Sequence, residues 1–289
     1  MEFDTIYSKF FDFLEIGDNH PTIIMGVLNL SPESFYKGSF YEDISTLEHA
    51  ALEMIKNGAK MLDLGARSTA PWSEKISIEE EVKRIVPAMK NLCKKIPENI
   101  IISVDTQYRE VAKSTFDIAS DFNKKIIIND VSCLKTDPSL ENFVIEEEIP
   151  IILMASKQVP GDLLHIKDII NEFQKTITRL ESKGFNVNNI ILDPGIGHWV
   201  EQKTYTYDLK IISNLNQLRN LNRPILVALS RKSFIGSILN IPEPEHRYYG
   251  TLSATAIAVY NGAHLVRTHD VNKELIEIIK MAETLRENK

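Results

Sequence analysis

The chain alternates between short apolar runs and longer amphipathic stretches, and this alternation is its most regular feature. Eight apolar runs have the length of a buried strand, and a stretch with apolar residues at helical spacing follows each of them. Continuous apolar runs are typical of parallel strands that are covered on both faces. The predicted strands are 22–28, 59–65, 100–105, 125–130, 150–154, 189–193, 224–230 and 263–268.

The stretches between these runs carry the signals of helices. The first has apolar residues at Leu47, Ala51 and Met54, and Gly58 stops it. The second begins after Ser77, which is a favourable N-cap before a glutamate-rich first turn. The predicted helices are 44–57, 77–95, 108–119, 138–147, 162–183, 208–218, 232–239, 246–261 and 272–286.

The order of strand and helix predicts the fold. A strand followed by a helix, repeated eight times, favours a single-domain (β/α)8 TIM barrel over residues 21–289. An open doubly wound sheet is the alternative, but no glycine-rich dinucleotide fingerprint follows the first strand. Residues 1–20 precede that strand, and we expect them to form an N-terminal extension that caps the bottom of the barrel or packs on its side.

Polar side chains stand where several of the predicted strands end. Asp105, Asn129 and Asp193 follow the third, fourth and sixth strands, whose ends meet at one mouth in a barrel. Two carboxylates and an amide suit a flat heterocycle with several N–H donors. Alternatively, each of the three caps the next helix or turn, as aspartate often does. Because all three occur together, we favour a binding site.

Basic residues follow the last two strands. Ser230 and Lys232 stand where a strand runs into a helix, and the amino end of a helix favours anions. Arg267 and His269 are two positions apart, so on an extended backbone they point the same way. The corresponding loops of barrels commonly bind phosphate, which predicts a phosphate or diphosphate clamp. A solvated basic edge and a Schiff base at Lys232 are the alternatives.

Composition limits the partners and the compartment. The net charge of −7 argues against general binding of nucleic acid but permits a small anionic ligand. The two cysteines match no metal or redox spacing, which predicts a reducing compartment, the cytoplasm. The acidic N-terminus predicts no signal peptide, and no apolar run approaches the length of a membrane span.

Two of the predicted connections are long. The segments 29–41 and 66–77 both follow strands and therefore belong to the catalytic face of a barrel. Both carry glycine, serine and proline together with aromatic residues. We interpret them as lids over the site, and the alternative is two mobile surface loops.

Seven short stretches, at the expected strand ends and in this order, resemble the dihydropteroate synthase family of pterin-binding barrels. The resemblance runs from residue 22 to residue 271. Any one stretch alone is weak, whereas seven in order are specific. They are MGVLNLSPESF (25–35), DLGARST (63–69), SVDT (103–106), IND (128–130), DPGIG (193–197), SRKSFIG (230–236) and RTHD (267–270).

The resemblance implies an activity and a set of site residues. The family joins a 6-hydroxymethyl-dihydropterin diphosphate to an aromatic amine and releases diphosphate. It implies small-molecule substrates, Mg²⁺ as the cofactor and a homodimer formed through outer helices. The implied catalytic residues that hold the pterin are Asp105, Asn129, Asp193, Lys232 and Arg267. Diphosphate and Mg²⁺ would be held by Asn29, Arg267 and His269, with Asn29 as metal ligand. Further substrate-binding residues would be Arg67, Ser68, Thr69, Met154, Ser230 and Ser233.

Departures from the family pattern gather on the loops that should meet the amine. Ala70 stands where the family usually has arginine, and Ala155 stands where it has histidine. His198-Trp199-Val200 replaces the usual Phe-Gly-Lys. We therefore expect an altered amine pocket, with Arg67 as a candidate to replace the lost arginine. An archaeal-type variant that takes a ribofuranosyl-aminobenzene phosphate for a methanopterin-like cofactor would fit.

Two other functions remain open from the sequence. One is a pterin-binding methyltransferase that passes a methyl group to a corrinoid partner. It would share Asp105, Asn129 and Asp193 but would not need a diphosphate clamp, so Lys232 and His269 argue against it. The other is a non-catalytic pterin-binding protein, which only the altered second loop favours.

Overall fold

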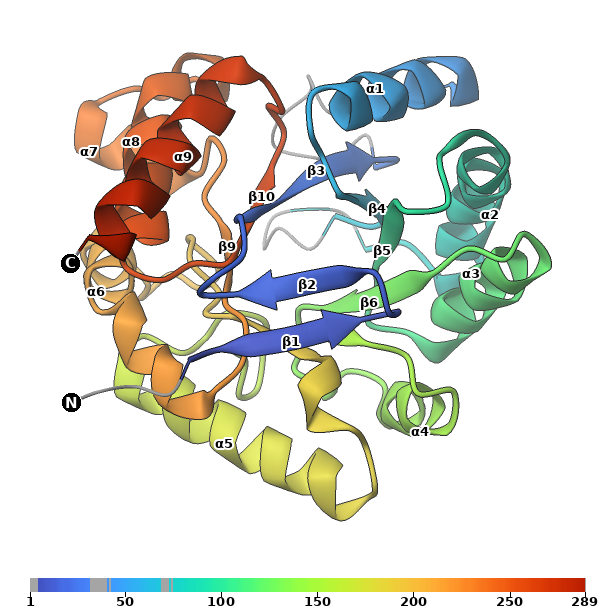
Figure 1. Ribbon diagram of the computed structural model, residues 1–289. Helices are drawn as coiled ribbons and strands as arrows, with labels where there is room; N and C mark the ends of the chain where they lie inside the picture. The colour runs from blue at the N-terminus through green and yellow to red at the C-terminus, as the bar shows by residue number, and fades with distance from the viewer. Residues whose placement is uncertain (1–4, 32–40, 42, 69–72, 74, 289) are drawn as a thin grey trace.

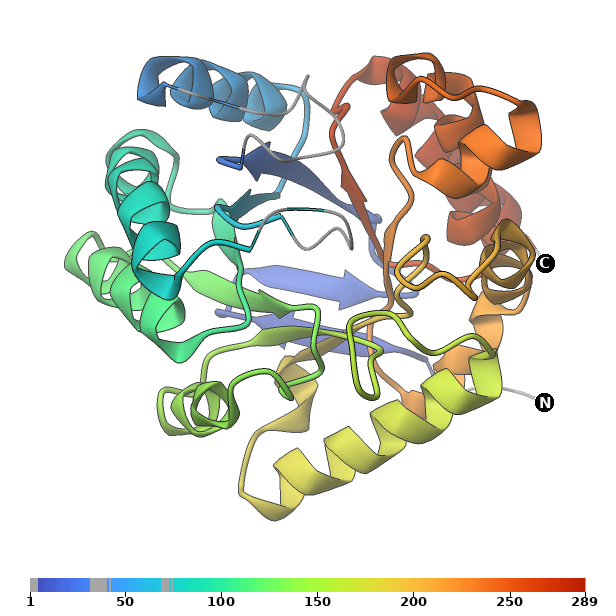
Figure 2. The ribbon, with the colours of Figure 1, turned by 180° about the vertical axis from the view of Figure 1, so that it is seen from behind.

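The parallel strands form a barrel ringed by helices (Figure 1, Figure 2). The computed structural model describes residues 5–31, 41, 43–68, 73 and 75–288. In these residues the strand order of the eight-stranded sheet is β8-β7-β6-β5-β4-β3-β10-β9. Between β8 and β9 the described chain has an isolated bridge from Leu192 to Ile225 in place of a ladder. The barrel is therefore nearly closed, with one seam, and the predicted TIM barrel is confirmed.

The barrel strands match the predicted runs, and most are shorter, while β3 extends one residue beyond its run to Asn29. The predicted strand 224–230, for example, is reduced to three residues in β9. The strands are β3 (Ile23–Asn29), β4 (Met61–Gly65), β5 (Ile101–Asp105), β6 (Ile126–Asp130), β7 (Ile151–Met154), β8 (Ile190–Asp193), β9 (Leu226–Ala228) and β10 (Leu265–Thr268).

The helices follow the predicted order, and none of those described is long and apolar enough to cross a membrane. They are α1 (Ile44–Lys56), α2 (Ile78–Lys95), α3 (Arg109–Asp121), α4 (Pro138–Glu146), α5 (Ile166–Ser182), α6 (Tyr205–Ser213), α7 (Ser233–Leu239), α8 (Tyr248–Tyr260) and α9 (Lys273–Glu287). Short 3-10 helices are η2 (Val187–Asn189), η3 (Leu215–Leu221) and η4 (Pro244–His246).

Two of the predicted helices had boundaries that were wrong by three to five residues. The helix expected from residue 162 begins at Ile166, because the Asp162 carboxylate instead closes a turn by accepting the N–H groups of Lys157 and Gln158. The helix expected over 208–218 begins at Tyr205 and ends at Ser213, and the chain continues as η3. There the Asn214 side chain donates to the carbonyl of Lys210 at 2.8 Å, which supports the tighter turn.

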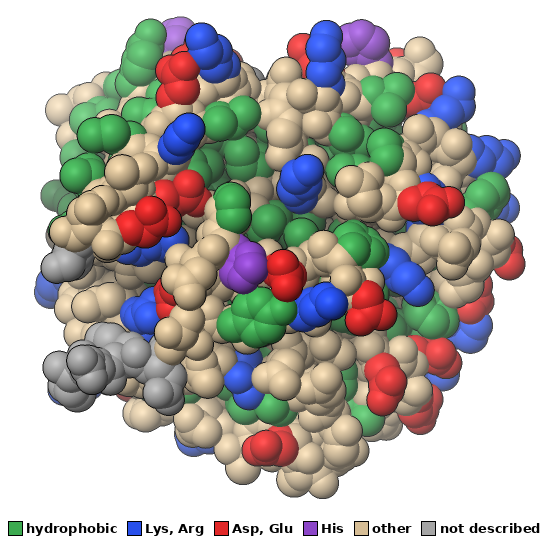
Figure 3. Space-filling model, in the orientation of Figure 1, with side chains coloured by type: hydrophobic (Ala, Val, Ile, Leu, Met, Phe, Trp, Pro, Cys, Tyr) green, Lys and Arg blue, Asp and Glu red, His purple; other side chains and the backbone are tan. Residues whose placement is uncertain are grey.

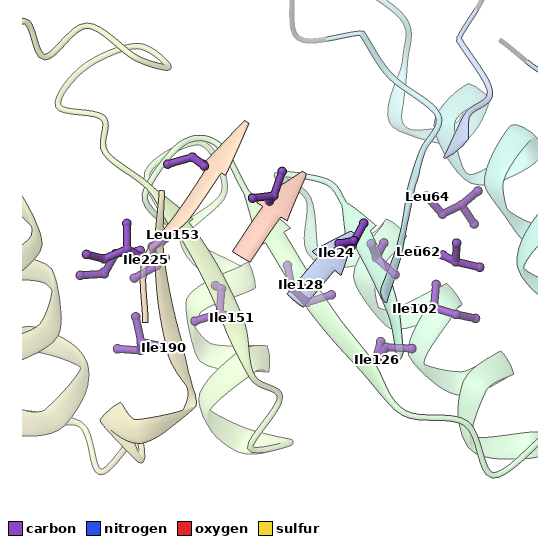
Figure 4. Packing of buried hydrophobic residues seen from close by; sticks show 14 of the residues in the cluster. Ile24, Leu62, Leu64, Ile102, Ile126, Ile128, Ile151, Leu153, Ile190 and Ile225 are labelled. Atoms are coloured by element: carbon purple, nitrogen blue, oxygen red, sulfur yellow. The ribbon is translucent and has the colours of Figure 1, made fainter. Parts of the chain in front are cut away.

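The barrel has two hydrophobic layers, because successive strand residues point to opposite faces. Residues such as Met25, Met61 and Ile127 pack inside the barrel. Their neighbours point outward against the helices, where the close view in Figure 4 shows Leu62 and Ile128 among others. This double burial explains why the strands read as continuous apolar runs. It also means that a polar residue at an inward position faces the barrel interior.

The N-terminal segment covers the bottom of the barrel. Its antiparallel strands β1 (Tyr7–Phe10) and β2 (Leu14–Gly17) lie across that end in Figure 1. Phe10 and Leu14 join the hydrophobic core inside the barrel. A space-filling view of the same end shows acidic and basic side chains intermingled (Figure 3). Of the two expected placements, the structure therefore shows the cap at the bottom, which leaves the opposite end as the mouth.

Candidate active site

A cavity of about 310 Å³ opens at the carboxyl ends of the strands. It therefore lies where a barrel places its active site. Thr69 lies outside the described residues, as does most of the two predicted lid loops, so their roles stay predictions. Of the other predicted site residues, Ser230 is not in the lining. Those that line the cavity are Asn29, Arg67, Ser68, Asp105, Asn129, Met154, Asp193, Lys232, Ser233, Arg267 and His269.

An arginine between two aspartates forms the floor of the cavity. The guanidinium of Arg267 donates from Nε to Asp63 Oδ2 at 2.5 Å and from the terminal nitrogen Nη2 to Asp105 Oδ2 at 3.0 Å. Asp63 is fully buried on β4. Asp63 also accepts a 2.5 Å hydrogen bond from the Ser103 hydroxyl and a longer one, 3.3 Å, from the Asn129 amide. Asp63 thus orients both Arg267 and Asn129.

The sequence analysis did not assign a role to Asp63. Asp63 was visible as a polar residue after Met61 and Leu62, but roles were predicted only for residues at strand ends, and Asp63 lies two positions before Gly65, the last residue of β4. The ladder pairs Asp63 with Val27 on one side and Ser103 on the other. The sequence did show a charged residue within an apolar strand. Because residues two positions apart point to the same face of a strand, Asp63 could have been placed on the same inward face as Gly65.

Burial and like charge change the protonation of Asp105. Loss of solvent, followed by repulsion from Asp63, raises the pKa of the Asp105 carboxyl to about 8, although Arg267 opposes the shift. At neutral pH the ligand-free site therefore keeps a proton on this aspartate. A ligand that offers N–H donors would favour the charged carboxylate and release that proton.

The second acidic wall is the turn after β8. Asp193 accepts a hydrogen bond from the Gly195 N–H at 2.8 Å, and burial raises the pKa of its carboxyl. Across this turn, the Lys232 ammonium donates to the carbonyl of Ile196 at 2.5 Å and lies 5.5 Å from the centre of the Trp199 ring. Burial lowers the pKa of Lys232 to about 8. Asp193 and Lys232 therefore face one region of the cavity.

The predicted clamp brings Ser230 and His269 together. The Ser230 hydroxyl lies 3.0 Å from His269 Nδ1 and accepts the backbone N–H of the same histidine at 3.3 Å. Burial, followed by the positive charge of Arg267, lowers the pKa of His269 to about 3. The imidazole is therefore neutral at neutral pH. Ser230 acts on the site by orienting His269.

Arg231 has a different position from the other basic residues. It adopts a left-handed backbone conformation, with φ of 56°, and pairs through two nitrogens with Asp270, both at 2.8 Å. It also donates to the carbonyls of Pro244 and Glu245. Arg231 thus ties together the segments after β9 and β10, and it is not among the residues that line the cavity.

Arg67 lines the cavity and is also held by its own surroundings. It donates to the buried carboxylate of Glu81 at 2.6 Å and to the carbonyl of Ile76 at 2.7 Å. Its guanidinium lies 4.9 Å from the centre of the Tyr108 ring. These contacts link the start of the second long loop to its end. Arg67 therefore lines the cavity from a fixed position, and its replacement of the lost loop arginine stays a prediction.

Other residues that the sequence analysis did not single out complete the site. Arg247 lines the cavity and donates to the carbonyls of Ile241 and Arg231, both at 3.0 Å. Lys203 and Asp208 are fully buried beside the turn after β8. Their sequence signal was weak, because a charged residue in a connection is normally taken to face solvent.

The arrangement has two chemical sides. Asp105, Asn129 and Asp193 present acceptors and an amide to one region, which suits a flat ring rich in N–H donors. Arg267 and His269 lie on the side of the last strand, where an anion would be held. A molecule that carries such a ring joined to an anionic group would span both regions.

Comparisons with known proteins agree with this geometry. Residues 25–269 match the family described as pterin binding enzyme. The dihydropteroate synthase of Clostridium beijerinckii is 37% identical over 258 residues, which cover 89% of this chain and 92% of the relative. The enzyme of Bacillus subtilis is 34% identical over 264 residues, with 91% of this chain and 88% of the relative covered.

Solved structures give the same result. A Yersinia pestis dihydropteroate synthase in a sulfonamide complex superposes with a TM-score of 0.85 at 28% identity, covering 98% of this chain and 100% of that one. A Coxiella burnetii dihydropteroate synthase in complex with pteroic acid has a TM-score of 0.81 at 31% identity, with 98% and 99% covered. The family prediction is confirmed, and this chain belongs to the dihydropteroate synthase family of pterin-binding enzymes.

Proposed function

We propose that this chain transfers the pterinylmethyl group of 6-hydroxymethyl-7,8-dihydropterin diphosphate to an aromatic amine. The C–O bond to diphosphate breaks, a C–N bond forms, and the amine loses a proton. The observation that carries the proposal is the juxtaposition of Asp105, Asn129 and Asp193 with Arg267 and His269 around one cavity. Family membership supports the same reaction.

The acidic wall would bind the pterin ring. Ring N–H groups can donate to Asp105 and Asp193, while Asn129 is held by Asp63 in a fixed orientation. Lys232 is oriented by the Ile196 carbonyl and can donate to the carbonyl of the ring. Such paired, charge-assisted hydrogen bonds in a buried site are strong and specific. Holding the ring fixed also holds its methylene carbon in place for attack.

The opposite side would stabilise the leaving diphosphate. Arg267 is held between Asp63 and Asp105 and can contact anionic oxygens as negative charge develops. His269 is neutral at neutral pH and can donate one hydrogen bond. The aromatic amine is already a competent nucleophile, so the site needs to position it more than to deprotonate it.

On this side of the cavity, Mg²⁺ would be coordinated jointly by the protein and the substrate. The described residues contain no group of three acidic, histidine or cysteine side chains that could hold a metal ion alone. Asn29 offers a hard amide oxygen at the end of β3, and the diphosphate oxygens would complete the coordination. When bound, the ion would neutralise charge on the leaving group.

The amine is p-aminobenzoate or an analogue of it. A Xanthomonas albilineans dihydropteroate synthase, 26% identical with a TM-score of 0.82 over 98% of each chain, was solved with 4-aminobenzoic acid. Trp199 lines the cavity, and Ala155 follows Met154, which also lines it. Both residues are positions at which this chain departs from the family pattern. A ribofuranosyl-aminobenzene phosphate, as in methanopterin synthesis, therefore stays our second candidate.

The test is release of diphosphate. The protein should release it when given the pterin diphosphate, Mg²⁺ and p-aminobenzoate, and much less when the amine is omitted. Running the phosphorylated ribose analogue in parallel identifies the preferred amine. If neither amine leads to release while the pterin diphosphate still binds, the chain is a binding protein and the proposal is wrong. Tight binding of a methylated folate without affinity for diphosphate would instead support the methyltransferase.

A homodimer is part of the proposal. The outer helices α7 and α8 expose apolar side chains, among them Leu239, Tyr249 and Ile257, and Tyr249 is 80% exposed. Exposed apolar clusters of this kind mark interfaces, and a second copy of the chain is the occupant that the family resemblance implies. Sedimentation should show a dimer for the native chain and a monomer for Tyr249→Glu/Ile257→Asp. A native monomer would refute this part.

The compartment is the remaining proposal. Cys93 and Cys133 are both buried and unpaired. Unpaired thiols are typical of a reducing compartment, so the cytoplasm remains our prediction. Localisation of a tagged full-length chain would test it.

A further inference from the structure

Lys203 is a fully buried lysine in the segment that leads into α6. It lines no wall of the cavity, and the proposed reaction gives it no role. Burying an ammonium group is costly unless hydrogen bonds and charges compensate for it. The hydrogen bonds that its ammonium group donates should therefore explain why this lysine is buried.

The ammonium of Lys203 joins two loops at the mouth of the barrel. Its Nζ donates to the carbonyl of Gly195 at 2.5 Å and to the carbonyl of Gly161 at 3.3 Å. Gly195 belongs to the turn after β8, and Gly161 belongs to the loop after β7. Burial lowers the pKa of Lys203, and the carboxylates of Asp208 and Asp193 oppose that shift.

Asp208 holds the other end of the same turn. Its Oδ1 accepts the N–H of Gly197 at 2.8 Å. Its Oδ2 has no hydrogen-bond partner among the described residues, and the whole side chain is buried. The pKa of the Asp208 carboxyl is raised by burial, and the charge of Lys203 opposes this. The two residues thus balance each other's charge on the far side of the turn from the cavity.

The turn that they hold carries two of the pterin contacts. Gly195 donates its N–H to Asp193, and the carbonyl of Ile196 accepts from Lys232. Ile196 therefore lies between one residue fixed by Lys203 and another fixed by Asp208. A shift of this backbone would move the Asp193 carboxylate and the Lys232 ammonium together.

We propose that Lys203 is a positioning residue for the pterin substrate, which keeps Asp193 and Lys232 directed at the same ring. The inference rests on the proposed function for the identity of that ring. It assigns Lys203 no contact with substrate. It predicts an effect on pterin binding that leaves the diphosphate side intact, because Arg267 and His269 lie on β10 and the segment after it.

The experiment compares Lys203→Met, Asp208→Asn and the double variant with the native full-length chain. Asparagine at 208 keeps an oxygen for Gly197 while removing the charge. The double variant therefore leaves no unbalanced charge in the interior, which separates folding from positioning. Lys210→Met, an exposed position on α6, is the matched control.

We expect Lys203→Met and the double variant to raise KM for the pterin diphosphate roughly ten- to a hundredfold. The values for Lys210→Met should stay at the native level. The double variant should unfold at a higher temperature than Lys203→Met without recovering its KM. A double variant with native KM for the pterin diphosphate would overturn the inference.

Calorimetry with 6-hydroxymethyl-dihydropterin provides an independent readout. If the native chain releases no diphosphate with any amine, the proposed function fails, but binding of the pterin still tests Lys203. Lys203→Met should then bind the pterin roughly ten- to a hundredfold more weakly than Lys210→Met does. Equal affinity of the two variants would remove Lys203 from pterin recognition whatever the reaction.

Discussion

Replacing Asp63 by asparagine should change how stability depends on pH. The substitution keeps the shape of the side chain and an oxygen for Arg267, and its NH2 group can donate to the Ser103 hydroxyl, but it removes a buried negative charge. That charge is the second cause, after burial, of the raised pKa of Asp105. In Asp63→Asn the pKa of Asp105 should therefore fall toward its ordinary value.

The sign follows from proton linkage. The folded protein holds a proton on Asp105 up to a pH of about 8, whereas the unfolded chain loses it near 3.9. Between these values the folded state binds more protons, so this group makes stability fall as pH rises. His269 has the opposite effect, but only between its folded pKa of about 3 and its unfolded value near 6.5. Lys232 also makes stability rise with pH, mainly between its folded pKa of about 8 and its unfolded value near 10.4.

His269 and Lys232 contribute at the two ends of the interval from pH 6.5 to 8, but their contributions cancel when Asp63→Asn is compared with the native chain, because Asp63 is not among the causes of either shift. A single proton with a folded pKa of about 8 lowers the unfolding free energy of the native chain by about 1.5 kcal/mol across this interval. Asp63→Asn should be less stable at pH 6.5 by about 1–3 kcal/mol, from the weaker interaction with Arg267. The difference between the two proteins should then shrink toward pH 8.

Urea denaturation at four pH values in this interval provides the measurement. Asp121→Asn, at the exposed end of α3, is the control and should follow the native chain at every pH. A difference between Asp63→Asn and the native chain that stays constant or widens with pH would refute the coupling between Asp63 and Asp105.

Three further predictions concern binding and stability. Binding of the dihydropterin at pH 7 should release about one proton, because the N–H donors of the ring favour ionised Asp105, and calorimetry in buffers of different ionisation enthalpy would detect it. Gly197→Ala should weaken pterin binding about tenfold. The new methyl group would lie 3.1 Å from Lys232 Cδ, and the φ of +129° at this position strains any residue other than glycine. Unchanged affinity would contradict the placement of Lys232. Phe10→Ala should lower the unfolding free energy by about 3–5 kcal/mol through a cavity at the bottom of the barrel, while KM stays unchanged; a loss under 1 kcal/mol would show that β1 and β2 are dispensable.

Much of the fold could be predicted because the strands are buried on both faces. Runs such as Ile126–Asp130 are apolar until the point where they reach the mouth, so the pattern gives both the strand and its functional end. Asp105, Asn129 and Asp193 were found in this way. The binding site was thus visible wherever a polar residue terminates an apolar run.

The rest of the site depends on partners that are distant in sequence. Asp63 becomes significant only when the ladder places it next to Ser103 and near Arg267, 204 positions along the chain. Arg67 was expected to meet substrate, and its pairing with Glu81 depends on how α2 packs against β4. Lys203 lies in an irregular connection, where burial cannot be read from periodicity.

The seam between β8 and β9 has a consequence for the mechanics of the barrel. Asp193 ends one side of it, and Lys232 follows the other, where the described chain has a single bridge and the bond from the Leu192 N–H to the Pro224 carbonyl, 2.9 Å. A ligand bound by both residues would connect β8 and β9 at the point where the described strands share the fewest hydrogen bonds. Amide hydrogens of β8 and β9 would then exchange with solvent more slowly in the liganded protein. Their exchange rates would therefore report whether substrate is bound.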